Sequence, residues 1–348
     1  MQLRKCVVDV NAQRRLLTLI ATQPSAIAVT AGEAGATPSD ERFDAVLVYL
    51  HGFPDMAVHP TALDFASRMP FKLAEAWLSS SVSGDSSNKR GEQCNVAFVT
   101  FNFGGVPGSD QELRFTDKTI SQEVEDAVAV CEFVQRTLLK VDADGTTTIG
   151  RVRVVGLSTG AIVASLLRSR EGTADTIAVI AGLLDLKRGV EYDFSPQQLA
   201  QFESEGACWK EFYLPEGVLF PDNVEISFNG ETRTGEADAV GNERVVPRKV
   251  FIRLNRKYVD ECRDGTLDIQ RAVSSPDGAT ARRLPPFLVI HGDADQNVPF
   301  HNGEELFSAA SEPKTFLPIP KANHLLSNSK HLKKALKAII EHTHAEHE

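Results

Sequence analysis

A serine flanked by two glycines marks a sharp change of pattern in this chain. The short apolar run 152–155 stops at Gly156-Leu157-Ser158-Thr159-Gly160 and continues into a stretch of helical character. The pattern predicts a strand that turns abruptly into a helix, with Ser158 in strained backbone geometry at the bend. Side chains at positions 156 and 160 would crowd such a turn. The two glycines therefore fit it, and the serine hydroxyl is left exposed beyond the strand.

Other apolar runs have the length and composition of strands that are buried on both faces. They lie at residues 45–50, 95–101, 176–181, 286–290 and, in a shorter form, 315–319. Amphipathic segments alternate with them, as in the segment from Ile120 to Val134, where apolar residues recur at spacings of three and four. This alternation predicts an α/β fold, a mostly parallel central sheet with helices on both faces.

The first eighty residues add an opening pair of strands and a helix. The runs 5–10 and 16–21 predict the strands. Residues 60–79 are broadly helical, and Pro70 is expected to kink or break that helix. The intervening segment 23–44 is interpreted as a surface loop, and the Ser-rich segment 80–93 as a mobile insertion.

The segment 187–283 interrupts the alternation of strands and helices and is more polar than its flanks. Phe194-Ser195-Pro196 predicts the start of a short helix, and Asn229-Gly230 is a strong signal for a hairpin turn. The segment is poor in the long apolar runs that a large core of its own would need. We interpret it as a lid inserted after the sixth strand, into a core formed by residues 1–186 and 284–348.

Composition excludes several classes of function. The 348 residues carry a formal net charge of −10, and 42% of them are hydrophobic, which predicts an ordinary globular protein rather than one with a nucleic-acid surface. The basic cluster at residues 330–337 is interpreted as a solvated helix face. The pattern contains no signal peptide and no apolar run that could span a bilayer. We therefore expect a cytoplasmic protein.

We also expect no cofactor and no metal site. The five cysteines, Cys6, Cys94, Cys131, Cys208 and Cys262, are scattered without a C-x-x-C pair and predict reduced thiols. The turn 142–145 lacks the glutamate that a calcium loop needs at its twelfth position, where Arg153 stands. His342, His344 and His347 are assigned to a frayed terminus.

A serine nucleophile needs a base, and the base needs a carboxylate that fixes its tautomer. Among nine histidines, His324 alone both follows the last predicted strand and comes at a suitable interval after an aspartate-rich strand end. His51 and His291, each before a glycine at a strand end, are interpreted as structural. The chain order of serine, aspartate and histidine is the one that α/β-hydrolases use.

Four motifs together resemble the α/β-hydrolase superfamily over nearly the whole chain. They are His51-Gly52-Phe53-Pro54, Gly156-Leu157-Ser158-Thr159-Gly160, His291-Gly292 with Asp295 and Val298-Pro299, and Ala322-Asn323-His324. The resemblance implies a catalytic triad of Ser158, His324 and the later aspartate, Asp295. Asp293 and, after the sixth strand, Asp185 are competing candidates for the acid. The resemblance also implies an oxyanion hole formed by the backbone N–H groups of Phe53 and Thr159, the latter at a helix N-terminus.

One loop departs from this resemblance. Many relatives carry Asp-x-Arg-Gly-x-Gly-x-Ser after the fourth strand, whereas this chain has Asn102-Phe103-Gly104-Gly105-Val106-Pro107-Gly108-Ser109. The arginine is missing, so a salt bridge that would brace the loop is not expected.

The sequence resembles capped esterases of the feruloyl and cinnamoyl type and hydrolases similar to serine aminopeptidases. This implies a small-molecule carboxylic ester, cleaved through an acyl-enzyme, as the leading substrate. An acyltransferase, a thioesterase, an aminopeptidase-like enzyme and a non-catalytic binding protein are the alternatives. Aromatic residues of the lid either line an acyl pocket or form the small core of the lid: Phe194, Phe202, Trp209, Phe212, Tyr213 and Phe220. Trp209, Phe212 and Tyr213 are the candidates for substrate binding.

Overall fold

The computed structural model describes most of the chain. The described residues are 1–12, 14–24, 41–80, 94–109, 114–145, 147–214, 226–228, 231–233, 249–274 and 284–344. Of Tyr213, Lys249 and strands β8 and β9 only the backbone is described.

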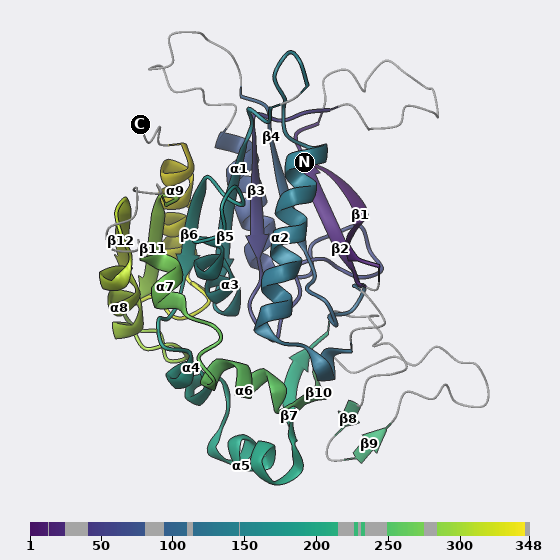
Figure 1. Cartoon of the computed structure of the whole chain (residues 1–348), viewed down its shortest axis with the longest axis vertical. Coiled ribbons are helices and arrows are strands. Elements are labelled where there is room, and N and C mark those ends of the chain that lie inside the picture. Colours follow the sequence, from purple (N-terminus) through teal and green to yellow (C-terminus); the bar gives the residue numbers. More distant parts are fainter. Residues whose placement is uncertain are drawn as a thin grey trace, which may run out of the picture.

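A central sheet of eight strands forms the core, in the order β1-β2-β4-β3-β5-β6-β11-β12 (Figure 1). Strands β1 and β2 are antiparallel to each other, and β2 is antiparallel to β4, whereas β4 and all the strands beyond it run parallel. The predicted mostly parallel sheet is therefore confirmed. The strands are β1 (Gln2–Asn11), β2 (Arg14–Thr22), β3 (Ala45–Leu50), β4 (Val96–Phe101), β5 (Arg151–Leu157), β6 (Thr176–Ile180), β11 (Phe287–Gly292) and β12 (Lys314–Ile319).

Helices cover both faces of the sheet, which explains why its central strands are continuous apolar runs. Every residue of β3 and β4 is buried, and alternate side chains enter two different clusters. Val46 and Val48 pack with helices α2 (Ile120–Thr137) and α3 (Thr159–Leu167). Leu47 and Tyr49 pack on the other face with α1 (Arg68–Ser80) and α9 (Ser329–His344).

Two predictions about helices are wrong. Helix α1 begins at Arg68, so residues 60–67 are not helical, and Pro70 lies in the first turn, where its missing N–H breaks no helical hydrogen bond. Helix α9 extends through His342 and His344, which the sequence assigned to a frayed terminus. His344 stacks on Trp77 of α1 with ring centroids 5.2 Å apart. His347 lies outside the described residues.

Between β6 and β11 the described residues form a second, antiparallel sheet and four helices. The second sheet, α4, α5 and α6 lie below the central sheet in Figure 1, whereas α7 lies beside it. The strand order of the second sheet is β7-β10-β8-β9. Strands β8 and β9 pair as the predicted hairpin would require, but the turn 229–230 lies outside the described residues. The elements are α4 (Leu186–Asp193), α5 (Pro196–Glu205), β7 (Ala207–Tyr213), β8 (Ile226–Phe228), β9 (Glu231–Arg233), β10 (Lys249–Asn255), α6 (Lys257–Arg263) and α7 (Ile269–Val273).

This inserted segment shares an apolar core with the main sheet. Phe194, Phe212 and Tyr258 of the insertion belong to the same buried cluster as Ile120 and Val124 of α2. All five cysteines are free thiols, and Cys131, Cys208 and Cys262 are buried. Among the helices of the described ranges, none is long and apolar enough to cross a membrane.

Candidate active site

Ser158 lies at a strained bend between β5 and α3. Its backbone has φ 56° and ψ −120°, a conformation that L residues rarely adopt. A Cβ added to Gly156 would lie 2.1 Å from the carbonyl oxygen of Gly160, and one added to Gly160 would lie 2.2 Å from that of Leu50. No side chain fits at either position, so the two glycines are what allow α3 to start this close to β3 and β5.

His324 lies between Ser158 and Asp295. Its Nε2 is 3.0 Å from the Ser158 hydroxyl oxygen, and its Nδ1 is 2.8 Å from Oδ2 of Asp295. Asp295 follows the end of β11, and His324 follows the end of β12. The parallel sheet therefore brings together residues that are far apart in the chain. A hydrogen bond donated by Nδ1 to the carboxylate leaves Nε2 free to accept the serine proton.

Asp295 is held ionised. Burial works to raise its pKa, but hydrogen bonds from His291 and His324 outweigh burial and hold the pKa of Asp295 well below its usual range. Its other oxygen, Oδ1, accepts from the backbone N–H groups of Asn297 and Val298, each at 2.9 Å. The carboxylate is thus fixed in charge and orientation.

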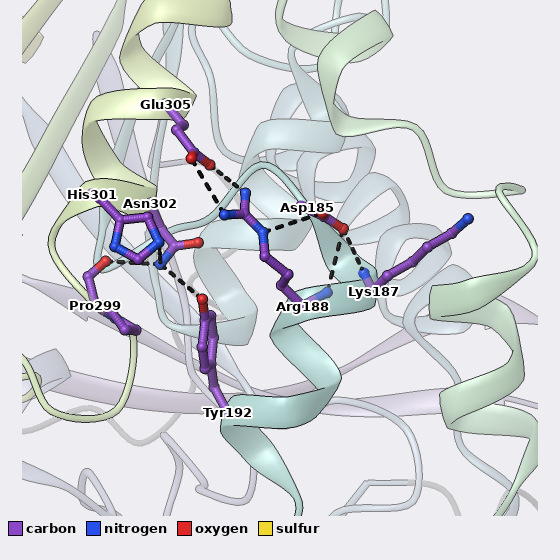
Figure 2. A network of polar contacts seen from close by, with 8 residues as sticks. All are labelled: Asp185, Lys187, Arg188, Tyr192, Pro299, His301, Asn302 and Glu305. Atoms are coloured by element: carbon purple, nitrogen blue, oxygen red, sulfur yellow. Dashed lines mark hydrogen bonds and ion pairs between the residues drawn. The ribbon is translucent and has the colours of Figure 1, made fainter.

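The two competing aspartates have other partners. Oδ1 of Asp293 accepts a hydrogen bond of 2.5 Å from the backbone N–H of Lys321. Asp185 caps the N-terminus of α4 through the N–H groups of Lys187 and Arg188, and also binds the Arg188 guanidinium, as Figure 2 shows. The structure therefore brings Asp295, and not these two, against His324.

The two other strand-end histidines contact backbone, as expected. Nδ1 of His51 donates to the Gly52 carbonyl oxygen at 2.8 Å, and Nε2 accepts from the Phe103 N–H at 3.3 Å. Burial, assisted by the charge of Lys118, lowers the pKa of His51 to about 3, so its imidazole is neutral. Nε2 of His291 lies 2.9 Å from the Val298 carbonyl oxygen.

The loop after β3 passes directly beside the serine. A Cβ on Gly52 would be 3.1 Å from the Cβ of Ser158, a tight contact that glycine avoids. Phe53 follows in this loop, and Thr159 is the first residue of α3. Within the described part of the chain, the backbone N–H groups of Phe53 and Thr159 donate no hydrogen bond. Neither amide therefore has an acceptor among the described residues.

Asn102 braces the loop after β4, in which Gly104 stands at the position of the missing arginine. Its fully buried side chain accepts from the N–H groups of Ala57 and Val58, each at 2.9 Å. It also donates to the carbonyl oxygens of Val58 and Pro107, at 2.8 and 2.9 Å. The amide thus ties the loops after β3 and β4 together without a salt bridge.

Aromatic rings and two lysines surround Phe53. Its ring stacks on Phe115 and Tyr258, with centroids 5.6 and 5.1 Å away. The ammonium groups of Lys118 and Lys210 lie 5.5 and 5.7 Å from the ring centre. Lys118 is itself buried and forms a 2.5 Å ion pair with Glu123 of α2. Sequence reasoning missed this cluster because its members come from separate elements.

Two narrow cavities lie at the site, and the first of them adjoins Ser158. One is lined by Ser158, Thr159, Ile162, Ala181, Leu183, Gly189, Tyr192, Asp193 and Val298. The other shares Ile162, Gly189 and Asp193 with it and continues to Tyr258 and Cys262. Sequence reasoning also missed Asp193, because a single acidic residue near the end of a helix carries no signal that it lines a cavity.

Two of the three predicted substrate-binding aromatics, Trp209 and Phe212, do not line these two cavities. Phe212 is fully buried against Phe115, with ring centroids 5.5 Å apart, and Trp209 is half-buried. The side chain of Tyr213 and all of Phe220 lie outside the described residues. Of the six lid aromatics, Phe194 lines the second cavity. In the described ranges no group of three or more His, Cys, Asp or Glu residues could hold a metal ion.

No model of a known protein family matches the chain. A protein of Escherichia coli strain K12 named "Uncharacterized protein YfhR" is 45% identical over 40 residues, which are 12% of this chain and 14% of that protein. The match thus covers a small part of that relative.

Solved structures match nearly the whole chain at low sequence identity. The esterase domain of a Rhodothermus marinus protein is 17% identical with a TM-score of 0.53, over 98% of this chain and 97% of that one. Est1E from Butyrivibrio proteoclasticus, with ferulic acid bound, is 14% identical with a TM-score of 0.56, over 97% of both chains. The α/β-hydrolase GrgF from Penicillium sp. sh18 is 12% identical with a TM-score of 0.54, over 98% of both. These likenesses and the strand order show that the chain has the α/β-hydrolase fold.

Proposed function

We propose that this protein is a serine hydrolase that cleaves a carboxylic ester through an acyl-enzyme. One observation carries the proposal: the His324 ring bridges the Ser158 hydroxyl and the Asp295 carboxylate at hydrogen-bonding distance. The strained bend at Ser158 and the two unpaired amides of Phe53 and Thr159 support it. The esterases among the structural neighbours make an ester the first substrate class to test.

In the proposed reaction, Ser158 Oγ forms a bond to the acyl carbon while its proton passes to Nε2 of His324. The carbonyl electron pair moves onto oxygen, where the N–H groups of Phe53 and Thr159 stabilise the negative charge. The carbon–oxygen bond to the alcohol then breaks, and His324 returns its proton to the leaving alcohol. Water repeats these steps and releases the acid, while Asp295 holds the imidazole in place.

Replacing the nucleophile tests the proposal. Ser158→Ala is expected to lower turnover of p-nitrophenyl butyrate by roughly 10⁴ to 10⁶ fold, the scale of triad knockouts. A fluorophosphonate should label the wild-type protein on Ser158 and leave the variant unlabelled. Ser204→Ala, an exposed serine on α5, is the matched control and should behave as wild type. Wild-type turnover by a folded Ser158→Ala protein would refute the triad.

A substrate panel separates the related activities. A thioester, an aminoacyl amide and an ester in the presence of a competing alcohol distinguish thioesterase, aminopeptidase-like and acyltransferase activity from hydrolysis of esters. A folded protein that neither reacts with the fluorophosphonate nor turns over any of these substrates would instead be a binding protein.

We further propose that residues 187–283 act as a lid on the core formed by 1–186 and 284–348. Tyr192 and Asp193 of α4 support this, because they line the cavity beside Ser158. That cavity has a volume of about 10 Å³, room for one water molecule. An acyl group larger than this fits only when side chains that line the cavity move outward.

A further inference from the structure

We propose that Asp193 selects the substrate: its carboxylate binds a hydrogen-bond donor, an ammonium or a hydroxyl group, carried by the acyl chain. The inference rests on the proposed function, because the acyl chain in question is the one that Ser158 accepts. Asp193 then disfavours acyl chains that end in a carboxylate.

The position of Asp193 is the first argument. It is the last residue of α4 and lines both the cavity beside Ser158 and the second cavity next to it. The other residues at the junction of the two cavities, Ile162 and Gly189, offer only apolar surface. The electrostatic influence of His324 reaches Asp193. A group bound at Asp193 would therefore belong to the same molecule that reacts at Ser158.

The missing partner of Asp193 is the second argument. Within the described part of the chain, no donor forms a hydrogen bond with its carboxylate, although burial raises the pKa of Asp193. The nearby ammonium of Lys210 is oriented elsewhere: it donates to the backbone carbonyl oxygen of Asp193 and lies 4.6 Å from the centre of the Phe194 ring. Lys210 and His324 both favour the ionised carboxylate through their charge. A partly buried carboxylate without a donor among the described residues gains from a ligand that supplies one.

The third argument is that the structure fixes Asp193 in place. Helix α4 is fastened to α8 (His301–Ala309) on one side, where Arg188 pairs with Glu305 and with Asp185 (Figure 2). Tyr192 directly precedes Asp193 in the chain. Its hydroxyl lies 3.4 Å from Nδ2 of the buried Asn302, as Figure 2 also shows.

On the other side of Asp193, Phe194 packs edge-on against Phe202, with ring centroids 5.2 Å apart. A carboxylate held by neighbours on both sides can discriminate between ligands without first being ordered.

The test compares straight-chain acyl p-nitrophenyl esters that differ only in the end group, at several chain lengths. The end groups are methyl, hydroxyl, ammonium and carboxylate. At the best length, kcat/KM of the wild type should be roughly 10 to 100 fold higher for the ammonium or hydroxyl end than for the methyl end, the scale of one hydrogen bond to a charged group. Comparing kcat/KM between the ammonium-ended and the hydroxyl-ended esters shows which of the two donors the site prefers.

Asp193→Asn should remove most of the preference for the ammonium end and weaken the preference for the hydroxyl end less, because the amide keeps an acceptor oxygen but loses the charge. The methyl-ended ester should stay within roughly threefold of wild type. Activity on the carboxylate-ended ester should rise in the same variant. Glu191→Gln is the matched control, because it removes one negative charge from an exposed position on the same helix and should change nothing.

A uniform fall of activity across all four end groups in Asp193→Asn would overturn the inference, since Asp193 would then act through His324 or the fold. Equal wild-type rates for all end groups, with hydrolysis still lost in Ser158→Ala, would overturn the inference and leave the proposed function standing. If no ester reacts, labelling rates of Ser158 with alkyl and aminoalkyl fluorophosphonates give the same comparison. Absence of labelling by both reagents would refute the proposed function and the inference together.

Discussion

At the scale of single residues, the surroundings of Asp55 change the pKa of its carboxyl group. Asp55 directly follows the motif His51-Gly52-Phe53-Pro54, and its carboxylate accepts a 2.8 Å hydrogen bond from the backbone N–H of Met56. Burial raises the pKa of Asp55 to about 6, although the hydrogen bonds from Met56 and Ser67 act in the opposite direction. The loop that carries Phe53 therefore contains a carboxyl group that is costly to ionise.

This shift predicts a pH-dependent stability. Between pH 4 and 6 the folded protein holds the Asp55 proton more tightly than the unfolded chain does, so Asp55 makes the free energy of unfolding fall as pH rises through that window. Asp55→Asn keeps the acceptor for Met56 but cannot ionise. The variant should gain stability relative to wild type from pH 4 to pH 7, measured by urea denaturation. A difference between the two proteins that does not vary with pH would contradict the prediction.

At the scale of elements, α4 and α8 are joined by an exposed ion pair. The side chains of Arg188 and Glu305 are 38% and 40% exposed, so the pair is weak in water. It nevertheless connects the inserted segment to the main fold at the helix that carries Asp193. Removing the pair should therefore loosen α4 locally and change the stability of the whole protein little.

Glu305→Gln is expected to lower the free energy of unfolding by less than about 1 kcal/mol, as for other exposed pairs. Backbone amide hydrogens of α4 should exchange faster in this variant, because α4 detaches more often from α8. Glu341→Gln, which removes an exposed pair with Lys337 on α9, is the control. Hydrogen exchange measured by mass spectrometry compares α4 in the two variants. Unchanged exchange in α4 of Glu305→Gln would show that other contacts hold the helix.

For the whole molecule, the shared apolar core predicts one unfolding transition. Phe194 and Phe212 of the insertion are buried with residues of α2, so neither part keeps a complete core without the other. The two tryptophans report on the parts separately: Trp77 lies in α1 and Trp209 in β7. Each of the variants Trp77→Phe and Trp209→Phe keeps one tryptophan. During unfolding, the fluorescence of that tryptophan should change with the same midpoint as the far-UV circular dichroism. Separate midpoints would mean that the insertion unfolds independently.

The sequence predicted best those features that a local pattern determines. The continuous apolar runs identified the buried strands, because most positions of a parallel sheet that is covered on both faces are filled by apolar side chains. The glycines around Ser158 indicated the bend for a steric reason that needs no distant partner. The extent of α1 was predicted wrongly, because an apolar spacing continues across residues 60–67 although the helix starts only two residues before Pro70.

Features that depend on distant partners were not predicted. Asn102 braces two loops, but the four groups that it binds are known only once β3 and β4 lie side by side. The contact of His344 with Trp77 joins residues from opposite ends of the chain. Phe212, a candidate for substrate binding, packs against Phe115 instead, since a buried aromatic run is equally compatible with a pocket and with a core.

His324 follows β12, which is the outermost strand on its side of the sheet, whereas Ser158 lies at the end of β5 near the middle. Edge elements open more readily than central ones. Detachment of β12 would separate His324 from a serine that remains correctly placed, with most of the sheet still paired. Under the proposed mechanism, heat inactivation would then run ahead of the loss of secondary structure, and recovery on cooling would require only that one strand dock again.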